Sequence, residues 1–237
     1  GDRTYRNSGY AFNTTFTPDP PYISEENNYT GSLRRTFDLP ADWKGDDVYF
    51  HVGSATSNLM LWINGKYVGY SEDSKVAAEF NITKYLKPGR NLIAMQIMRW
   101  CDGSYLEDQD FWRFTGVARE VYLYARPKVH VEDINIKQDL TDGFKTGRLT
   151  CDVDLKGAKN VEVTFLLCDA DGKQVQETTV QAGAGRCKGE MTLPGAKAWT
   201  AETPYLYTLY TVLKQDGKVV ESIPQKVGFR HIEIKGA

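Results

Sequence analysis

Apolar and polar residues alternate along much of the chain with the two-residue period of strands that bury one face. The period is clear in Val48, Phe50 and Val52, which would share one side of a strand. The dipeptide Asn64-Gly65 separates two such runs and is typical of a type I′ hairpin turn, which needs two positive φ angles. Strands are predicted over residues 32–39, 47–53, 58–63, 66–70, 80–83, 92–98 and 120–124. With no helical run of ten residues between them, they indicate an antiparallel sandwich of the jelly-roll kind.

A second strand series follows Ala125-Arg126-Pro127, where proline ends the last strand of the first series. Strands are predicted over residues 129–137, 148–155, 161–168, 173–181, 187–193, 206–214 and 219–223. About seven strands over about a hundred residues fit an immunoglobulin-like sandwich. The sequence therefore predicts an all-β chain with a jelly-roll (galactose-binding-like) domain at 1–126, an immunoglobulin-like β-sandwich at 127–229 and the start of a linker at 230–237.

Composition narrows the classes of partner. The net charge of −2 argues against a nucleic acid or an anionic membrane, and no apolar run approaches a membrane span. The four cysteines lack C-x-x-C spacing, so neither a zinc site nor a redox motif is expected. Free thiols are favoured over two disulfides, because buried cysteine packs as a small hydrophobe. No signal peptide precedes Gly1, but a leading glycine can be left by cloning, so a bacterial cytoplasmic or periplasmic location stays open.

The stretch from Arg99 to Tyr124 reads RWCDGSYLEDQDFWRFTGVAREVYLY and has the composition of a binding loop between two strands. A simple connection would be a few small polar residues, whereas this one mixes carboxylates with large aromatics. Aromatic faces pack on the C–H surfaces of sugars, and carboxylates accept hydrogen bonds from hydroxyl pairs. Arg99, Arg113 and Arg119 are expected to pair with some of the acids. The alternative is a solvated acidic loop beside an aromatic cluster, and composition alone does not separate the two.

The run DGSYLEDQDFWR followed by TGVAR closely resembles the large bacterial β-galactosidases of glycoside hydrolase family 2. The resemblance implies that the last aspartate of EDQD, Asp110, contacts the galactoside and a bound sodium ion. Upstream, Tyr5-Arg6-Asn7 resembles a Tyr-x-Asn motif of this family whose asparagine binds substrate, so Asn7 is expected beside Asp110. The segments GSATSNLMLWINGKYVGY and AWTAETPYLY resemble the family's sugar-binding domain and its second domain. His51 and Trp199 are expected to be structural, with Trp199 covering the second core.

The same resemblance implies that catalysis lies outside this sequence. In the family, Gly228-Phe229-Arg230 leads into a (β/α)₈ barrel that supplies two catalytic glutamates and the magnesium ligands. Retaining hydrolysis needs two carboxyl groups about 5–5.5 Å apart. Glu107 and Asp108 are not expected to substitute, because neighbours in an extended loop point to opposite sides. No catalytic residue is therefore predicted here, and the chain is interpreted as the non-catalytic amino-terminal part of a β-galactosidase.

The expected partners are a β-galactoside sugar and the barrel of the same parent chain, with sodium and magnesium in the full enzyme and no cofactor for this chain alone. A homo-oligomeric parent stays open. The rival interpretations are a free-standing carbohydrate-binding module, a structural sandwich pair used in adhesion, and a β-glucuronidase or β-mannosidase parent. Further strands precede Tyr-x-Asn in the family, so the first sandwich is expected to lack its first strands. It should then open more readily than the second and self-associate through the uncovered edge.

Overall fold

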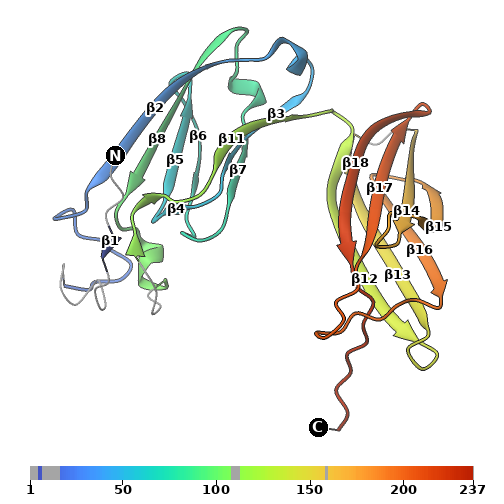
Figure 1. Cartoon of the computed structure of the whole chain (residues 1–237). Helices are drawn as coiled ribbons and strands as arrows, with labels where there is room; N and C mark the ends of the chain where they lie inside the picture. Colours follow the sequence, from blue (N-terminus) through green and yellow to red (C-terminus); the bar gives the residue numbers. More distant parts are fainter. Residues whose placement is uncertain (1–4, 7–16, 108–112, 158–159, 237) are drawn as a thin grey trace. The chain divides into compact units, whose positions relative to one another are not determined.

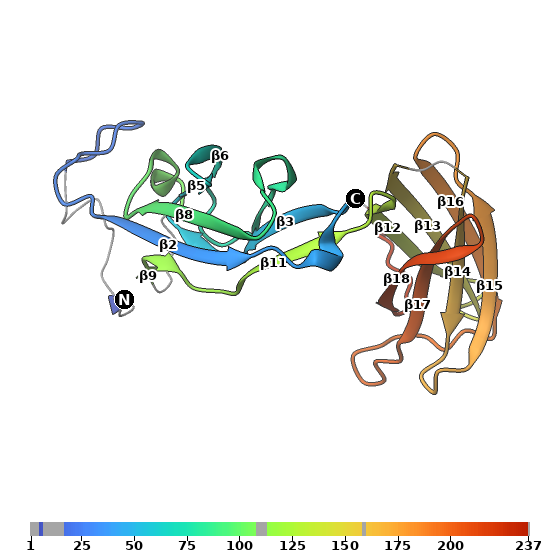
Figure 2. The ribbon, with the colours of Figure 1, turned by 90° about the horizontal axis from the view of Figure 1, so that it is seen from above.

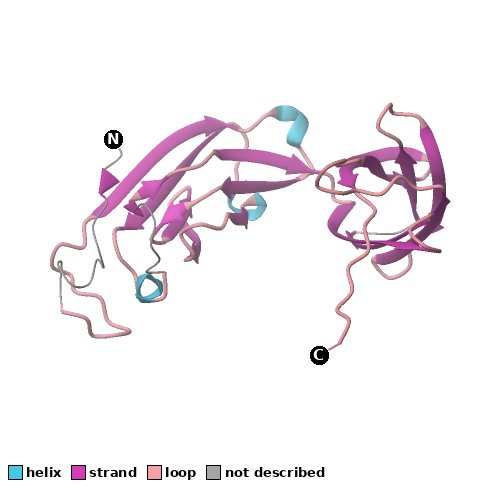
Figure 3. Cartoon of the chain, turned by 60° about the horizontal axis from the view of Figure 1, so that its bottom comes forward, coloured by secondary structure: helices cyan, strands magenta, loops and turns pink. Residues whose placement is uncertain are grey.

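The computed structural model describes residues 5–6, 17–107, 113–157 and 160–236, and it consists of antiparallel strands joined by loops and short 3₁₀ turns (Figures 1 and 3). The part of the chain that it describes contains no α-helix, and no helix there is long and apolar enough to cross a membrane. The predicted all-β class is thus confirmed. Two compact units divide between Arg126 and Pro127.

The first unit contains two main sheets, one of four strands in the order β2-β8-β5-β6 and one of three in the order β11-β3-β7. Their bounds are β2 (Thr30–Asp38), β3 (Asp47–Val52), β5 (Leu59–Ile63), β6 (Lys66–Ser71), β7 (Ala78–Asn81), β8 (Arg90–Met98) and β11 (Val121–Arg126). Two short ladders pair β4 (Ala55–Thr56) with β10 (Gly116–Val117), and β1 (Tyr5–Arg6) with β9 (Arg113–Phe114). Short 3₁₀ turns occupy η1 (Ala41–Trp43), η2 (Thr83–Tyr85) and η3 (Asp102–Tyr105).

The predicted alternation builds the core of this unit. Val48, Phe50 and Val52 of β3 are buried in one cluster with Leu61 and Ile63 of β5. The predicted hairpin turn is confirmed, since Asn64 has φ 51° and Gly65 has φ 78°, as a type I′ turn requires. His51, on the opposite face of β3, bonds Glu79 through Nδ1 at 2.8 Å and stacks on Tyr122. These contacts are consistent with the structural role expected of His51.

The second unit is also a sandwich, of a three-stranded sheet β12-β13-β16 and a four-stranded sheet β15-β14-β17-β18 (Figure 2). The bounds are β12 (His130–Thr141), β13 (Thr146–Lys156), β14 (Val161–Cys168), β15 (Gln174–Gln181), β16 (Arg186–Pro194), β17 (Tyr207–Gln215) and β18 (Lys218–Val227). These strands correspond one to one with the second series predicted from sequence, and the register is antiparallel throughout.

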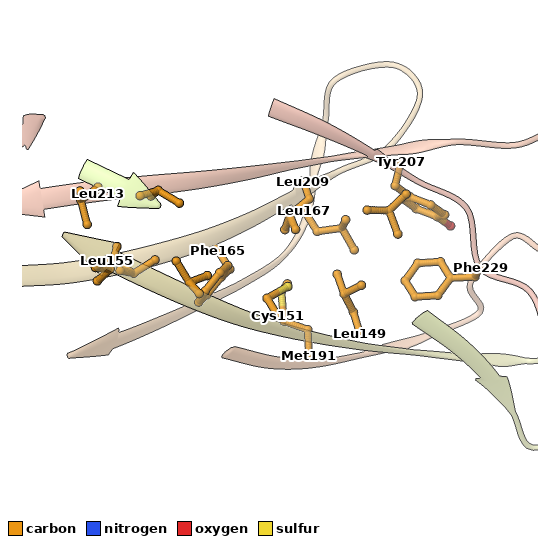
Figure 4. Close-up of a cluster of buried hydrophobic side chains, with 14 of the residues drawn as sticks. Leu149, Cys151, Leu155, Phe165, Leu167, Met191, Tyr207, Leu209, Leu213 and Phe229 are labelled. Atoms are coloured by element: carbon orange, nitrogen blue, oxygen red, sulfur yellow. The ribbon is translucent and has the colours of Figure 1, made fainter. Parts of the chain in front are cut away.

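Large apolar side chains from both sheets fill the second core (Figure 4). Phe165 has no exposed surface and lies over Gly189, where an added Cβ would come within 2.4 Å of the ring. Only glycine fits at that point of β16. Phe229, also fully buried, packs edge-on against Tyr207 with ring centroids 5.3 Å apart.

Two sequence expectations are refined by this core. Phe229 closes it at the end where the chain leaves the sandwich, whereas Trp199 is half-buried and lies against Gly228, with the Arg230 guanidinium over its ring. Trp199 therefore packs beside the core rather than covering it. All four cysteines lie among the described residues and are free thiols, Cys151 and Cys168 within or beside this core.

Candidate functional site

The candidate binding loop leaves the first sandwich at the end of β8 through a tight turn. In η3, the Ser104 N–H donates to the carbonyl of Cys101 at 3.0 Å, and the Ser104 hydroxyl accepts from the N–H of Cys101 at 3.1 Å. Ser104 is only 5% exposed, so this reciprocal pair is sheltered from water. The sequence predicted an irregular loop here, but a serine two residues after an aspartate closes it into a 3₁₀ turn.

Buried polar side chains fix the loop to the neighbouring segment that follows β4. The hydroxyl of Ser57 donates to the carbonyl of Met98 at 3.1 Å, and Asn58 Oδ1 accepts from the N–H of Met98 at 2.9 Å. The thiol of Cys101 lies 3.6 Å from the carbonyl of Ser57. These contacts satisfy backbone groups where strand pairing stops, which would otherwise be costly to bury.

Glu107 is held by a buried serine on a different loop. Its carboxylate accepts hydrogen bonds from the N–H of Ser74 at 2.8 Å and from the Ser74 hydroxyl at 2.5 Å. Ser74 is 1% exposed, and its carbonyl accepts from the hydroxyl of Ser54 at 3.1 Å. Bonds between an ionised acceptor and such donors are the stronger class of hydrogen bond. Glu107 therefore anchors the loop immediately before its central segment.

A carboxylate cluster lies beside the same turn. Glu72, Cys101 and Asp102 each offer a ligand atom within 4.8 Å of the others, and the Tyr70 hydroxyl donates to Glu72. Burial, together with the neighbouring charge of Asp102, raises the pKa of Glu72, while the Tyr70 bond opposes that rise. Burial also raises the pKa of the Cys101 thiol, which stays protonated at neutral pH. The two carboxylates are the part of this group suited to a hard cation.

The segment before β2 is tied to the other side of the loop. The hydroxyl of Tyr105 donates to the carbonyl of Tyr22 at 2.8 Å and accepts from the N–H of Asp19 at 3.1 Å. The side chain of Asn28 pairs with both backbone groups of Trp100, at 2.9 and 3.1 Å. The loop base is thus clamped from both flanks.

Asn7 and Asp110, the two substrate-binding residues expected from sequence, lie outside the described residues. Around them, β1 pairs antiparallel with β9, with Tyr5 opposite Phe114 and Arg6 opposite Arg113. The chain just before Asn7 and the chain just after the EDQDFW run are therefore neighbours. The sequence alone gave no measure of this proximity, because the two segments are about a hundred residues apart.

Two of the three arginines expected to pair with the loop acids have other contacts, and the side chain of the third, Arg113, lies outside the part that the structure describes. Arg119 donates to the carbonyl of Lys75 at 2.9 Å, and the Arg99 guanidinium lies over the Trp100 ring, 5.3 Å from its centroid. Ser74 rather than an arginine holds Glu107. Sequence reasoning missed Ser54, Ser57 and Ser74, and the only signal for them was an accumulation of small polar residues next to apolar strands.

Comparisons with known proteins cover both units. Residues 2–127 match the sequence profile described as "Glycosyl hydrolases family 2, sugar binding domain", and residues 129–230 match the profile "Glycosyl hydrolases family 2". A beta-galactosidase of Halalkalibacterium halodurans is 36% identical over 237 residues, which cover 99% of this chain and 23% of the relative. One from Clostridium acetobutylicum is 38% identical over 217 residues, which cover 91% and 24%. The chain thus spans about a quarter of the length of these curated relatives.

Solved structures share the fold. The FMN-binding beta-glucuronidase from Facaelibacterium prausnitzii L2-6 superposes with a TM-score of 0.77 at 21% identity, covering 86% of this chain and 33% of that one. A Bacteroides uniformis beta-glucuronidase gives 0.76 at 24% identity, covering 86% and 27%. At such identities the likeness is one of architecture, a jelly-roll domain followed by an immunoglobulin-like domain.

Proposed function

The chain belongs to glycosyl hydrolase family 2, and on that premise we propose that it is the amino-terminal, non-catalytic part of a β-galactosidase, an enzyme that hydrolyses terminal β-D-galactosides. The observation that carries the proposal is the identity of 36% and 38% to two β-galactosidases over nearly the whole chain. A β-glucuronidase parent is the weaker candidate, because the glucuronidase structures are related in fold at only 21–24% identity.

The role proposed for the first unit is to wall the substrate pocket with residues 102–113. Asn7 and Asp110 bind the galactoside, and Asp110 is also a ligand of sodium, a hard cation that takes carboxylate, carbonyl and water oxygens. Two observations support this role. The base of the loop is hydrogen-bonded at η3, between Ser104 and Cys101, and at Glu107, which accepts from Ser74. The β1–β9 ladder joins the two segments that carry Asn7 and Asp110.

The hydrolytic step itself is assigned to a (β/α)₈ barrel, which supplies both glutamates and the magnesium site. Among the described residues, two carboxylates near the loop base, Glu107 and Glu72, already have hydroxyl partners. Glu107 accepts from Ser74 and Glu72 accepts from Tyr70. A retaining pair needs one free nucleophile and one proton donor facing each other across the substrate. Neither Glu107 nor Glu72 is therefore assigned to either catalytic role.

An activity assay tests the non-catalytic assignment. The purified chain, at high concentration with an aryl β-galactoside, is expected to release no aglycone. Turnover that persists through purification and disappears in Glu107→Gln would contradict the assignment and place an acid/base residue in this loop.

A second experiment uses the full-length parent and asks whether Asp110 binds sugar. Asp110→Asn should lower kcat/KM by about 10–100-fold, the equivalent of about 1.5–3 kcal/mol for a hydrogen bond to a charged group. It should also weaken activation by sodium. Glu120→Gln, at an exposed position beyond the loop, is the matched control and should leave both unchanged. Wild-type kinetics and sodium response in Asp110→Asn would reduce the loop to a structural role.

Calorimetry with galactose distinguishes the proposed β-galactosidase fragment from a free-standing carbohydrate-binding module. The chain alone should bind galactose weakly, because most of the pocket is assigned to the barrel. An affinity in about the micromolar range would instead favour a self-contained carbohydrate-binding module.

A further inference from the structure

A hollow of about 440 Å³ lies on the outer face of the four-stranded sheet in the first unit. Among its lining residues, Ser32, Arg34, Trp62, Leu92, Ala94 and Gln96 project from this face, Gly65 lies in the turn, and Leu33 and Met95 belong to the row of Leu61 that faces the core. The hollow crosses β2, β8 and β5, which lie side by side (Figure 1). The strand register explains its shape. Arg34 of β2 pairs with Ala94 of β8, Ala94 pairs with Trp62 of β5, and Trp62 pairs with Tyr67 of β6.

Directly opposed residues of antiparallel strands project from the same face. Across the sheet, this row therefore consists of a long side chain (Arg34), a short one (Ala94) and two large rings (Trp62 and Tyr67). Arg34 and Trp62 stand two strand spacings apart, about 9.5 Å, with only the methyl group of Ala94 between them. The next row places Ser32 opposite Gln96 on the same face, and Leu92 closes the other end. The hollow thus exists because one alanine sits among long side chains.

Trp62 lies outside the buried apolar cluster of this unit and is only half-buried. Tyr67 beside it is 52% exposed, and the two rings are tilted with centroids 5.6 Å apart. An indole kept partly in water on an outer sheet face contributes less to folding than one in the core. Its ring and the aliphatic floor are, however, available to an apolar surface of a ligand.

The polar side of the hollow has complementary chemistry. Ser32 can donate and accept, Arg34 donates through a planar fork, and the Gln96 amide does both. Arg34 is the single charged side chain among the lining residues. A pyranose ring combines one C–H face with a rim of hydroxyls, and a site with a few placed polar groups and an aromatic wall is the usual form of a small-ligand pocket.

We propose that this hollow is a carbohydrate-binding subsite that takes a neutral pyranose ring of an oligosaccharide, with its C–H face on Trp62 and its hydroxyls on Arg34, Gln96 and Ser32. The site goes beyond the proposed role of the loop, because it uses none of residues 99–113. It supplies a surface on which a sugar chain is held by the sheet itself.

The test is a titration of the 237-residue chain with lactose, and with cellobiose as a second probe, followed by ¹H–¹⁵N NMR. The indole N–H signal of Trp62, assigned with Trp62→Phe, should shift saturably with a dissociation constant of about 1 mM. Ala94→Leu fills the floor and should abolish the shift. Arg34→Ala should weaken binding about tenfold, the loss of one charge-assisted hydrogen bond.

Arg35→Ala is the matched control. It removes the same charge from the next residue of β2, which pairs with Ile93 and faces the other side of the sheet. It should change the affinity by less than about twofold, since it touches no proposed contact. Thermal unfolding of each variant shows that it is folded, and Arg34→Ala keeps the test valid where Ala94→Leu fails to fold.

Three results would overturn the proposal. One is the lack of any saturable shift of Trp62 up to about 100 mM of either disaccharide, a concentration well above weak sugar affinities. Another is unchanged affinity in Ala94→Leu. The third is a response confined to Trp100 and Trp112, which would place sugar binding in the loop and favour the proposed function alone.

Discussion

The two sandwiches use burial for different ends. The second unit buries large apolar side chains from both of its sheets, including Phe165, Leu167, Leu209 and Phe229. The first unit buries apolar residues chiefly from β3, β5 and β8, and around the base of its loop it buries polar ones instead, namely Ser54, Ser57, Asn58, Ser74 and Ser104. A buried hydroxyl contributes little net stability but fixes geometry when its bonds are made. The comparison indicates a scaffold in the second unit and a positioned loop in the first.

Their outer strands differ as well. β2 spans nine residues, and all of them are exposed except Phe37, which is half-buried. Leu33, on the face of β2 that looks toward the core, keeps 46% of its surface in water. In the second unit, the outer strands β12, β16 and β18 each bury an apolar side chain in the core cluster, and β15 packs Val175 and Val180 against it partly buried. The first sandwich is therefore the less closed of the two.

Core truncation should give the largest effect. Phe229→Ala removes a fully buried ring and should lower the free energy of unfolding of the second unit by about 3–5 kcal/mol. Leu61→Ala is the counterpart in the first unit, at about 2–5 kcal/mol. Denaturant unfolding with probes in each unit measures both. Val219→Ala, at a 59% exposed position, is the control and should cost less than about 0.5 kcal/mol. If either core mutation melted both units equally, the two cores would not be independent.

Removal of the loop clamp should have a smaller effect, limited to the first unit. Ser74→Ala deletes one of the two hydrogen bonds to Glu107 and should cost about 1–3 kcal/mol. It should also speed cleavage of the loop by a protease, because the segment leading to Asp110 loses its anchor. Ser32→Ala, an exposed serine of β2, serves as the control. Unchanged cleavage in Ser74→Ala would mean that the clamp does not hold the loop.

Much of this architecture is encoded locally and so was predictable. The two-residue period placed nearly every long strand, and Asn64-Gly65 specified its turn through two positive φ angles. What the period does not encode is contact between distant positions. Glu107 and Ser74 are 33 residues apart, and either serine or arginine could satisfy a carboxylate. Likewise the row Arg34–Ala94–Trp62 exists only once the register is set, because no single segment contains it.

Hydrogen exchange compares the units directly. Amides of β2, β8 and β11 should exchange about tenfold faster than those of β13, β14 and β17, a difference in opening free energy of about 1.4 kcal/mol. The reason is the exposed edge at β2, which leaves backbone groups and apolar side chains accessible to water. Analytical ultracentrifugation should show weak self-association in parallel. Equal protection in a clean monomer would contradict the expectation that the edge at β2 opens more readily than the strands of the second unit.

The smallest effect on stability should come from an exposed ion pair, His231 with Asp139, where the chain leaves the second unit. His231 Nδ1 lies 2.7 Å from Asp139 Oδ1, and the bond raises the pKa of His231 above its usual 6.5 and lowers that of Asp139 below its usual 3.8. The contribution of His231 is complete below pH 6.5 and is lost as the pH rises through its raised pKa. That of Asp139 is complete above pH 3.8 and is lost as the pH falls through its lowered pKa. Both groups are largely exposed, so the effect on global stability should be near the limit of detection.

The local signal is easier to measure and sharpens the contrast with the buried clamp at Ser74. An NMR titration of the His231 ring should give a pKa above 6.5 that returns toward that value in Asp139→Asn. Glu233→Gln should move it less, because Glu233 lies 3.9 Å from Nε2 and contributes less than Asp139. High salt should reduce the shift in the wild type, since an exposed pair is screened, while the clamp at Ser74 should resist salt. A His231 pKa unmoved by Asp139→Asn would show that this pair does not hold the segment after Phe229 against β12.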